Sequence, residues 1–227
     1  MKKEMVGCVP GNVLGMLADL AHKLQNEAIM PKELALFLQR QNPFVESDLS
    51  AIFADWQEFW ADLGRFDFSG IRVPQIVPGF TRAIIVPQGH TLNREYELCQ
   101  ALFPCWRWTE DLDGVVTENE REPKESYFIW VRDQEEADEG LKNFSANDIK
   151  RKKLTTQTLL ERMIHERKFF KETGRHLDVS TRTLCSGSRD QSGSVPDVFW
   201  SDGEVSVDWY NSGGSSGGLR ARQVVSF

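Results

Sequence analysis

A chain of 227 residues with 40% hydrophobic residues and seven tryptophans can bury a sizeable core. Its 27 basic and 34 acidic side chains give a formal net charge of −7. This charge argues against nucleic acid as a partner, because nucleic-acid binding needs clustered Lys and Arg. The one basic run, 150–153, is expected to be exposed to solvent where the chain leads into a helix. The sequence contains no run of eighteen apolar residues, which predicts no membrane span.

The first residues and the cysteines bear on the compartment. Gly7-Cys8 stands where a lipoprotein cleavage site is sought, but Lys2, Lys3 and Glu4 replace the apolar run that a signal peptide needs. The four cysteines and four histidines are scattered, without a C-x-x-C pair, so neither a metal site nor a cofactor is expected. We therefore expect reduced thiols in the cytoplasm, or association with a virion if the gene belongs to a phage.

Residues 1–65 are expected to form an N-terminal helical region, because apolar residues recur every three or four positions. The pattern predicts a first helix from about residue 12, a second that begins at Pro31 and ends at Asn42-Pro43, and a third over about 48–63. An aromatic stripe on the third helix is expected to pack on the neighbouring domain. The alternative is that this stripe binds a partner and makes the chain a regulatory interaction protein. The stripe contains Trp56, Phe59 and Trp60.

The segment 66–79 is broken by glycines and prolines and is expected to be a linker into a domain over 80–227. In that domain the patterns predict strands at 82–86, 105–108 and 127–132, a polar loop at 111–125 and a weak helical segment within 133–153. Helices are predicted after the N-cap Thr91 and over about 156–171, with Gly174 ending the second. Within Trp106-Arg107-Trp108, buried tryptophans and an exposed arginine are expected, and the alternative is that these aromatic rings stack on a base or a sugar. The β pattern after Leu177 completes an α+β fold class.

A β-hairpin is predicted around Asp202-Gly203, a dipeptide typical of two-residue hairpin turns. Side chains of a strand alternate between two faces, and one face of this hairpin collects large apolar residues that must be buried. The opposite face mixes acids, hydroxyls and aromatic rings. It is expected to lie in solvent, where residues can change while the fold persists. The apolar face carries Val198, Trp200, Val205, Val207 and Trp209.

The tract from Asn211 to Gly218 reads NSGGSSGG, a composition typical of a flexible loop. It is followed by LRARQVV at 219–225, an alternating pattern that has to return to the sheet. The loop is therefore expected to rest on a rigid base. Leu219, Arg220 and Arg222 are expected to contribute to stability.

The layout from Gly193 onward is G-x-V-P-x-V-x-W-x-x-G-x-V-x-V-x-W-Y, a short loop, then L-R-x-R-x-V-V. It resembles variable proteins of diversity-generating retroelements, which are prokaryotic or viral. The resemblance implies a C-type lectin-like fold over 80–227 and a variable region at about 190–218, where copying of a template mutates adenines and AAC or AAT codons come to encode many residues. It also implies a non-enzymatic protein whose hypervariable surface binds a protein, cell-surface ligand or other macromolecule.

Every candidate ligand-binding position is encodable by a codon ending in C or T, as randomising the first two bases of AAC requires. Glu204 is not, and is treated as constant. Phe199 and Tyr210 are expected to be the energetic anchors, because aromatic residues dominate many interfaces. The candidates are Asp197, Phe199, Ser201, Asp202, Ser206, Asp208, Tyr210, Asn211, Ser212, Gly213, Gly214, Ser215, Ser216, Gly217 and Gly218.

Two other functions stay open. An enzyme of the formylglycine-generating type, on a related fold, needs a reactive thiol, and Cys185 is the best placed, although a small buried cysteine is the commoner state. A calcium-dependent carbohydrate-binding lectin would use oxygens of Asp202, Glu204 and Asp208, but no E-P-N or Q-P-D triplet occurs. The acidic runs at 110–113 and 135–139 are typical of solvated loops and helix starts. No catalytic or metal-binding residue is assigned.

Overall fold

The computed structural model describes residues 11–26, 29, 31–38 and 45–227. Its contacts divide the chain into two compact units, 1–55 and 56–227. The boundary therefore falls before the expected one at residue 65, and the segment 66–79 belongs to the second unit. Among the described residues, no helix is both long and apolar enough to cross a membrane.

The described part of the first unit is helical, as the apolar spacing predicts. Helix α1 spans Gly11–Gln25, and α2 spans Pro31–Leu38, so the second helix begins at the expected proline. Helix α3 spans Val45–Phe59 and continues into the second unit. The predicted stop at Asn42-Pro43 and the residues weighed for a signal peptide lie outside the described part of the chain.

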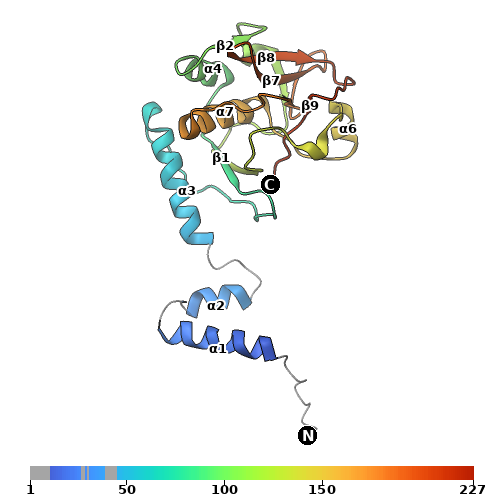
Figure 1. Cartoon of the computed structure of the whole chain (residues 1–227). Coiled ribbons are helices and arrows are strands. Elements are labelled where there is room, and N and C mark those ends of the chain that lie inside the picture. Colours follow the sequence, from blue (N-terminus) through green and yellow to red (C-terminus); the bar gives the residue numbers. More distant parts are fainter. Residues whose placement is uncertain (1–10, 27–28, 30, 39–44) are drawn as a thin grey trace. The chain divides into compact units, whose positions relative to one another are not determined.

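The described residues of the second unit form three sheets (Figure 1). Strands β1 and β4 pair antiparallel, as do β3 and β6, and the third sheet has the order β2-β8-β7-β5-β9. Its β2 pairs parallel with β8, and β9 pairs parallel with β5. The strands are β1 (Arg82–Val86), β2 (Cys105–Arg107), β3 (Val116–Asn119), β4 (Tyr127–Val131), β5 (Arg182–Leu184), β6 (Ser188–Asp190), β7 (Val195–Ser201), β8 (Glu204–Tyr210) and β9 (Leu219–Arg220).

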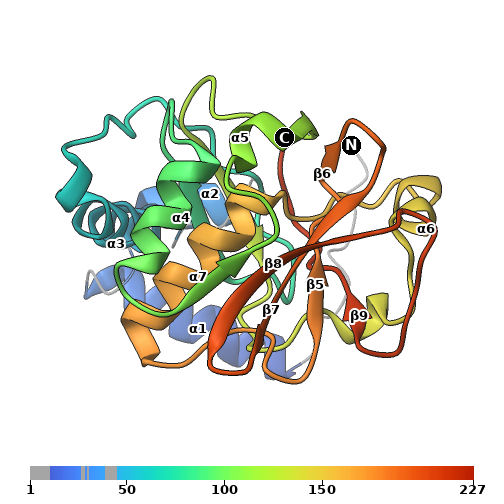
Figure 2. The ribbon, with the colours of Figure 1, turned by 90° about the horizontal axis from the view of Figure 1, so that it is seen from above.

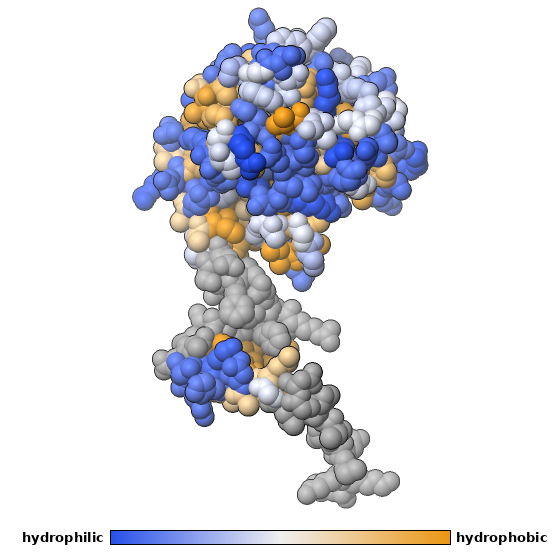
Figure 3. Space-filling model, viewed as in Figure 1, coloured by the Kyte–Doolittle hydropathy of each residue, from blue (hydrophilic) through white to orange (hydrophobic). Residues whose placement is uncertain are grey.

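The helices α4, α5, α6 and α7 of this unit begin at polar side chains that accept hydrogen bonds from free backbone N–H groups. Thr91 caps α4 as expected, and Thr158 and Ser145 form capping boxes at α7 and α6. Asp111 caps a short helix inside the region expected to be a loop. The helices are η1 (Ala61–Leu63), α4 (Leu92–Gln100), α5 (Leu112–Val115), η2 (Glu139–Leu141), α6 (Ala146–Arg151) and α7 (Leu159–Thr173). The architecture is mixed α+β, as predicted. On the face shown in Figure 3, the surface of the second unit is mostly hydrophilic, with small scattered hydrophobic areas.

Helix α7 lies at the centre of the second unit, in contact with β1, β7 and α4. It ends at Gly174 with φ of 68°, as the sequence predicts. An amphipathic helix with one buried side was expected, but every residue from Leu159 to Phe169 is buried. The difference arises because α7 is covered on several sides, so its polar side chains need partners inside the protein.

Those partners form a buried charge cluster, which we define as Arg162, Glu166, Asp178, Thr183 and Arg222. Asp178 Oδ2 accepts from Arg162 Nε and Nη2 at 3.0 and 2.8 Å, and its Oδ1 accepts from Arg222 Nη2 at 2.7 Å. Thr183 donates to Asp178 and accepts from Arg222. Burial opposes the charge of Asp178, yet Arg222 and Arg162 hold its pKa below the ordinary value. The cluster joins α7 to β5 and to the carboxyl-terminal segment.

The aromatic stripe of α3 packs inside the second unit, which confirms the packing alternative. Trp56, Phe59 and Trp60 are buried. The Arg167 guanidinium of α7 lies 4.1 Å from the ring centroid of Phe59 and 4.6 Å from that of Trp60. Trp60 Nε1 also donates a 3.2 Å hydrogen bond to the carbonyl oxygen of Ile85 in β1. These contacts fix residues 56–60 to the core rather than leaving them free for a partner.

The segment 66–79 contains neither helix nor strand, but it is held against the sheets. Phe68 is buried, and the indole of Trp130 donates a 3.0 Å hydrogen bond to the carbonyl oxygen of Pro74. The segment is therefore an ordered connection inside the second unit.

The segment after the Gly/Ser tract returns to the fold, but as single contacts rather than as one long strand. Only Leu219–Arg220 form a strand, and single bridges then join Gln223 to Thr156 and Val225 to Trp130. Leu219 and Arg222 are buried, and Arg222 is one of the two arginines of the charge cluster. The expected contribution of this segment to the fold is therefore present.

Candidate functional site

The hairpin β7–β8 turns at Asp202-Gly203, where φ is 54° and 86°. Two positive values are typical of the two-residue turn that the sequence predicts. One face of the hairpin is directed toward α7, which contacts β7, and Figure 2 shows the hairpin running alongside that helix. On this inner face Val198, Val205 and Val207 are buried as expected. Trp200 and Trp209 are only half-buried, and Trp200 stacks on His176 at 3.6 Å.

The outer face of the five-stranded sheet carries two rows of side chains across neighbouring strands. The register aligns Trp106 of β2 with Ser206 of β8, and Ser206 with Phe199 of β7. In the next row Asp208 of β8 stands opposite Asp197 of β7. Directly opposed residues of antiparallel strands have Cβ atoms about 4.5–5.5 Å apart, so Phe199 and Ser206 are close neighbours, as are Asp197 and Asp208. We call this surface the outer face.

The expectation that Asp197, Phe199 and Ser206 lie in solvent is wrong. Their exposed fractions are 0%, 8% and 6%. The guanidinium of Arg182 in β5 lies 3.4 Å from the ring centroid of Phe199, and its Nη1 lies 3.1 Å from Asp197 Oδ2. Arg182 thus covers two of these residues, and Ser206 lies between bulky neighbours in its row. Phe199 is consequently not an exposed anchor.

The remaining candidates on the hairpin keep contact with solvent. Asp202 is exposed at the turn, and Ser201, Asp208 and Tyr210 are partly exposed. The ring of Tyr210 packs on a cluster of buried hydrophobic residues. This cluster includes Ile149 of α6, Leu184 of β5 and Leu219 of β9. Tyr210 is therefore partly a packing residue.

The tract 211–218 is exposed or partly exposed throughout, and both of its ends are fixed. Asn211 Oδ1 accepts from the backbone N–H of Gly213 at 2.8 Å, and the carbonyl oxygen of Ser212 accepts from Asn147 of α6 at 2.9 Å. At the far end, the carbonyl oxygen of Gly218 accepts from Arg182 of β5 at 2.9 Å. The tract is an ordered loop between α6 and the sheet, as the rigid-base expectation requires. Its exposed members are Asn211, Gly213, Ser215, Ser216, Gly217 and Gly218, and its partly exposed members are Ser212 and Gly214.

The exposed aromatic residues of this surface are ones that the sequence pattern assigned to the core. Trp106 is 39% exposed and Trp108 is 71% exposed. Arg107 is directed to the opposite side, where its guanidinium lies 4.2 Å from the Tyr96 ring centroid. The alternation of side chains along a strand predicts that the two tryptophans and the arginine lie on opposite faces. Three residues are too few to predict which of the two faces is buried in the core.

Two of the groups considered for alternative chemistry, Cys185 and Asp113, are buried in the core or bound to backbone groups. Cys185 is fully buried, and burial raises the pKa of its thiol, which opposes formation of the reactive thiolate. Asp113 accepts hydrogen bonds from the backbone N–H groups of Leu92 and Asn93 at the start of α4. Among the described residues, no group of three or more His, Cys, Asp or Glu side chains is arranged to hold a metal ion.

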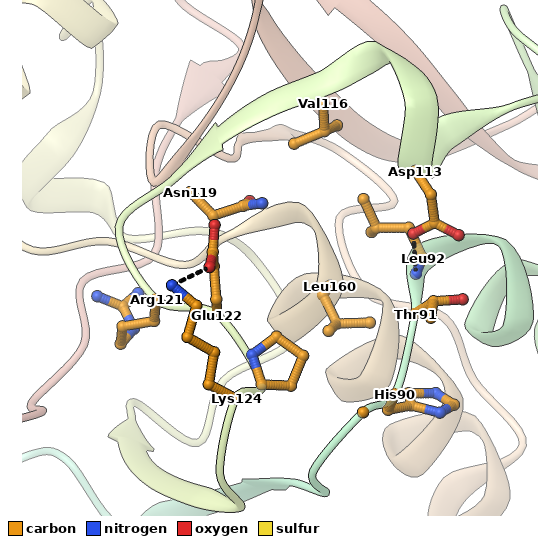
Figure 4. Close-up of a pocket in the computed structure, with 12 residues that line it drawn as sticks. His90, Thr91, Leu92, Asp113, Val116, Asn119, Arg121, Glu122, Lys124 and Leu160 are labelled. Atoms are coloured by element: carbon orange, nitrogen blue, oxygen red, sulfur yellow. Dashed lines mark hydrogen bonds and ion pairs between the residues drawn. The ribbon is translucent and has the colours of Figure 1, made fainter.

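A pocket of about 310 Å³ lies between α4, β3 and the loop before β4 (Figure 4). Its charged side chains already have partners within the protein. His90 contacts Glu95 at 2.7 Å, Arg121 contacts Glu161 at 2.6 Å, and Lys124 contacts Glu122 at 2.8 Å. These contacts leave the pocket without an unpaired acid or base among its lining residues, so we do not assign the candidate site to it.

The search against protein-family models gives no match, and neither the search of curated proteins nor that of solved structures gives one. The functional argument therefore rests on the residues and their arrangement.

The buried carboxyl of Asp197 should make stability depend on pH. Burial raises its pKa to about 6, because Arg182 offsets only part of the cost and Asp197 Oδ1 has no hydrogen-bond partner. A carboxyl whose pKa is raised in the folded state holds its proton there, so its stabilising contribution is complete below pH 4 and declines as the pH rises to about 6. The decline amounts to about 3 kcal/mol for a shift of roughly two units.

Asp197→Asn removes this titration while preserving shape. The difference in unfolding free energy between the variant and the parent protein, measured by urea denaturation, should shift in favour of the variant by about 2–3 kcal/mol between pH 4 and pH 7. Taking this difference cancels the titration of groups common to both chains. A difference independent of pH would contradict the raised pKa.

Proposed function

We propose that this chain is a non-enzymatic binding protein whose second unit, a C-type lectin-like domain, displays a surface diversified by a retroelement. The observation that carries the proposal is the exposure of the loop 211–218 on a fixed base. In this loop, residues encodable from randomised AAC codons coincide with positions whose side chains reach solvent. The ligand is a protein or another macromolecule, such as a molecule of a cell surface.

The arrangement of the outer face narrows the recognising surface. Asp197, Phe199 and Ser206 support the sheet under Arg182 and the neighbouring strands, so exchange at these positions alters packing. Recognition is assigned to the accessible remainder of the candidates, above all the turn at Asp202 and the loop. The inner face and the buried charge cluster hold the scaffold while these residues change.

The decisive experiment is to read the DNA that flanks the gene. We expect a non-coding near-copy of the segment encoding about 190–218, differing from it only where the copy carries adenine, together with a reverse-transcriptase gene. Deep sequencing of the same segment in a population should find substitutions confined to the candidate codons. Flanking DNA with no such copy would overturn the retroelement origin, whatever the protein binds.

The effect of substitutions on stability should differ sharply between positions of the loop. A Cβ atom at Gly218 has no heavy atom within 4 Å, whereas one at Gly214 would lie 2.5 Å from Tyr210 Cε1 and 3.2 Å from the Asn211 carbonyl oxygen. The combined variant Ser215→Tyr, Ser216→Tyr, Gly218→Ser should change the unfolding free energy by no more than about 0.5 kcal/mol. Gly214→Ser should cost about 1–3 kcal/mol by overpacking.

The same measurement, urea denaturation, tests the cause of that difference. Tyr210→Ser alone loses the packing of the ring, so the test is a double-mutant cycle: Gly214→Ser should cost much less in the Tyr210→Ser background than in the parent protein, which makes positions 210 and 214 a coupled pair. If the combined exposed variant unfolds, the loop is part of the scaffold and the assignment of recognition to it fails.

A further inference from the structure

Two exposed tryptophans form a corner at the edge of the outer face. The ring centroids of Trp106 and Trp108 lie 6.2 Å apart with an interplanar angle of 72°, so the two rings stand nearly perpendicular. Each aromatic face carries partial negative charge and attracts a cation placed over it. Two such faces set at an angle can contact one cationic group from two sides.

Carboxylates of β8 lie beside this corner. The register places Trp106 opposite Ser206, so Glu204 and Asp208 lie two residues before and after it on the same face of the strand. The backbone N–H of Trp108 donates to the Val207 carbonyl oxygen at 3.1 Å, which extends the pairing toward Asp208. Within the described part of the chain, neither Glu204 nor Asp208 forms a salt bridge.

On the same outer face, the neighbouring strand β7 already binds a guanidinium group of the protein itself. Arg182 stacks on the Phe199 ring and pairs with Asp197, so an aromatic ring and a carboxylate together hold one cation of the chain itself. Asp208 stands opposite Asp197, with the indole corner in place of Phe199. At this corner the protein supplies aromatic rings and negative charge, and among the described residues no Lys or Arg forms a salt bridge or cation–π contact with them.

We propose that the corner of Trp106 and Trp108, with Asp208 and Glu204, binds a basic side chain presented by a partner protein. The inference deepens the proposed function, on which it rests for the choice of a protein partner. It assigns a contact for Arg or Lys at the β2 edge of the sheet, formed by two tryptophans outside the variable region and by Asp208, one of the candidate variable positions. Arginine fits best, because its planar guanidinium can stack on indole while it donates to a carboxylate.

The probe is the blocked peptide acetyl-Gly-Arg-Gly-Arg-Gly-amide, titrated into the full-length protein at low ionic strength. The readout is the set of indole Nε1–H resonances in a proton–nitrogen correlation spectrum, assigned with Trp106→Phe and Trp108→Phe. We expect saturable shifts at these two indoles and none at buried Trp56 and Trp60. The peptide with citrulline in place of arginine keeps the shape without the charge and should bind about tenfold more weakly or not at all, because it forms neither the ion pair nor the cation contact.

Variants separate this site from general attraction to an acidic protein. Trp108→Ala and Asp208→Asn should each weaken binding about two- to fivefold. Asp62→Asn, whose side chain is 84% exposed elsewhere in the second unit, is the matched control and should leave binding unchanged. Unchanged shifts of the Trp56 and Trp60 indoles establish that each variant is folded.

Equal binding of the citrulline peptide, or equal weakening by Asp62→Asn and Asp208→Asn, would overturn the proposed site. The sequence of the flanking DNA and the peptide titration test the two proposals independently. A near-copy in the flanking DNA without indole shifts leaves the variable surface and removes the cation site. Indole shifts without a near-copy leave the cation site and remove the retroelement origin.

Discussion

Asp178→Ala is expected to lower the free energy of unfolding by about 3–5 kcal/mol, because the two buried arginines that share this carboxylate lose their counter-charge. Arg162 is fully buried and Arg222 almost so, and both donate to Asp178 over distances of 2.7 to 3.0 Å. Water cannot replace the lost partner without opening the core between α7 and β5. Urea denaturation at pH 7 measures the loss.

Asp62→Ala is the control for removing one carboxylate. Its side chain is 84% exposed, and the variant loses only one salt bridge, a 3.6 Å contact with Lys171. We therefore expect the free energy of unfolding to change by no more than about 0.5 kcal/mol. If Asp178→Ala leaves too little folded protein, Asp178→Asn keeps the shape and part of the hydrogen bonding and should give a smaller, measurable loss. A cost of under about 1 kcal/mol for both Asp178 variants would mean that the charge cluster does not hold the scaffold.

Trp60→Ala is expected to cost about 3–5 kcal/mol, the range for truncation of a fully buried large aromatic residue. The side chain is fully buried, packs edge-on against His90 at 4.9 Å, and donates a hydrogen bond to β1. Removing it leaves a cavity next to Arg167 and an unpaired carbonyl group at Ile85. The midpoint of urea unfolding should fall accordingly.

Trp108→Ala is the matched control, since it removes the same side chain from a site that is 71% exposed. We expect it to change stability by no more than about 0.5 kcal/mol. Similar effects of the two variants would contradict the placement of Trp60 in the core.

The positions of the local elements follow closely from the sequence. The strand over 82–86, the Thr91 cap, the left-handed Gly174 and the turn at Asp202-Gly203 are predicted because each depends on a few adjacent residues. The short helix and strand at 112–119 were missed. Strand β3 depends on pairing with β6, which lies about seventy residues away along the chain.

The candidate surface could be predicted only in part. The loop 211–218 was recognised from composition and from the segment that follows it, and its exposure agrees with that expectation. The covering of Asp197 and Phe199 by Arg182 was not visible, because Arg182 reaches them from a strand that precedes the hairpin. The exposure of Trp106 and Trp108 was missed for a related reason, since β2 is a short edge strand whose direction is set by its pairing with β8.

The α+β content, the hairpin with its two chemically different faces and the loop that follows can be predicted from the order of the amino acids. Which of those residues reach solvent, how α7 becomes enclosed, and where a cluster of opposite charges lies in the core depend on contacts between distant segments. The physical reason is the range of the interactions. Turns, caps and alternation arise between residues a few positions apart, whereas burial arises from strands and helices that the order β2-β8-β7-β5-β9 brings together from distant parts of the chain.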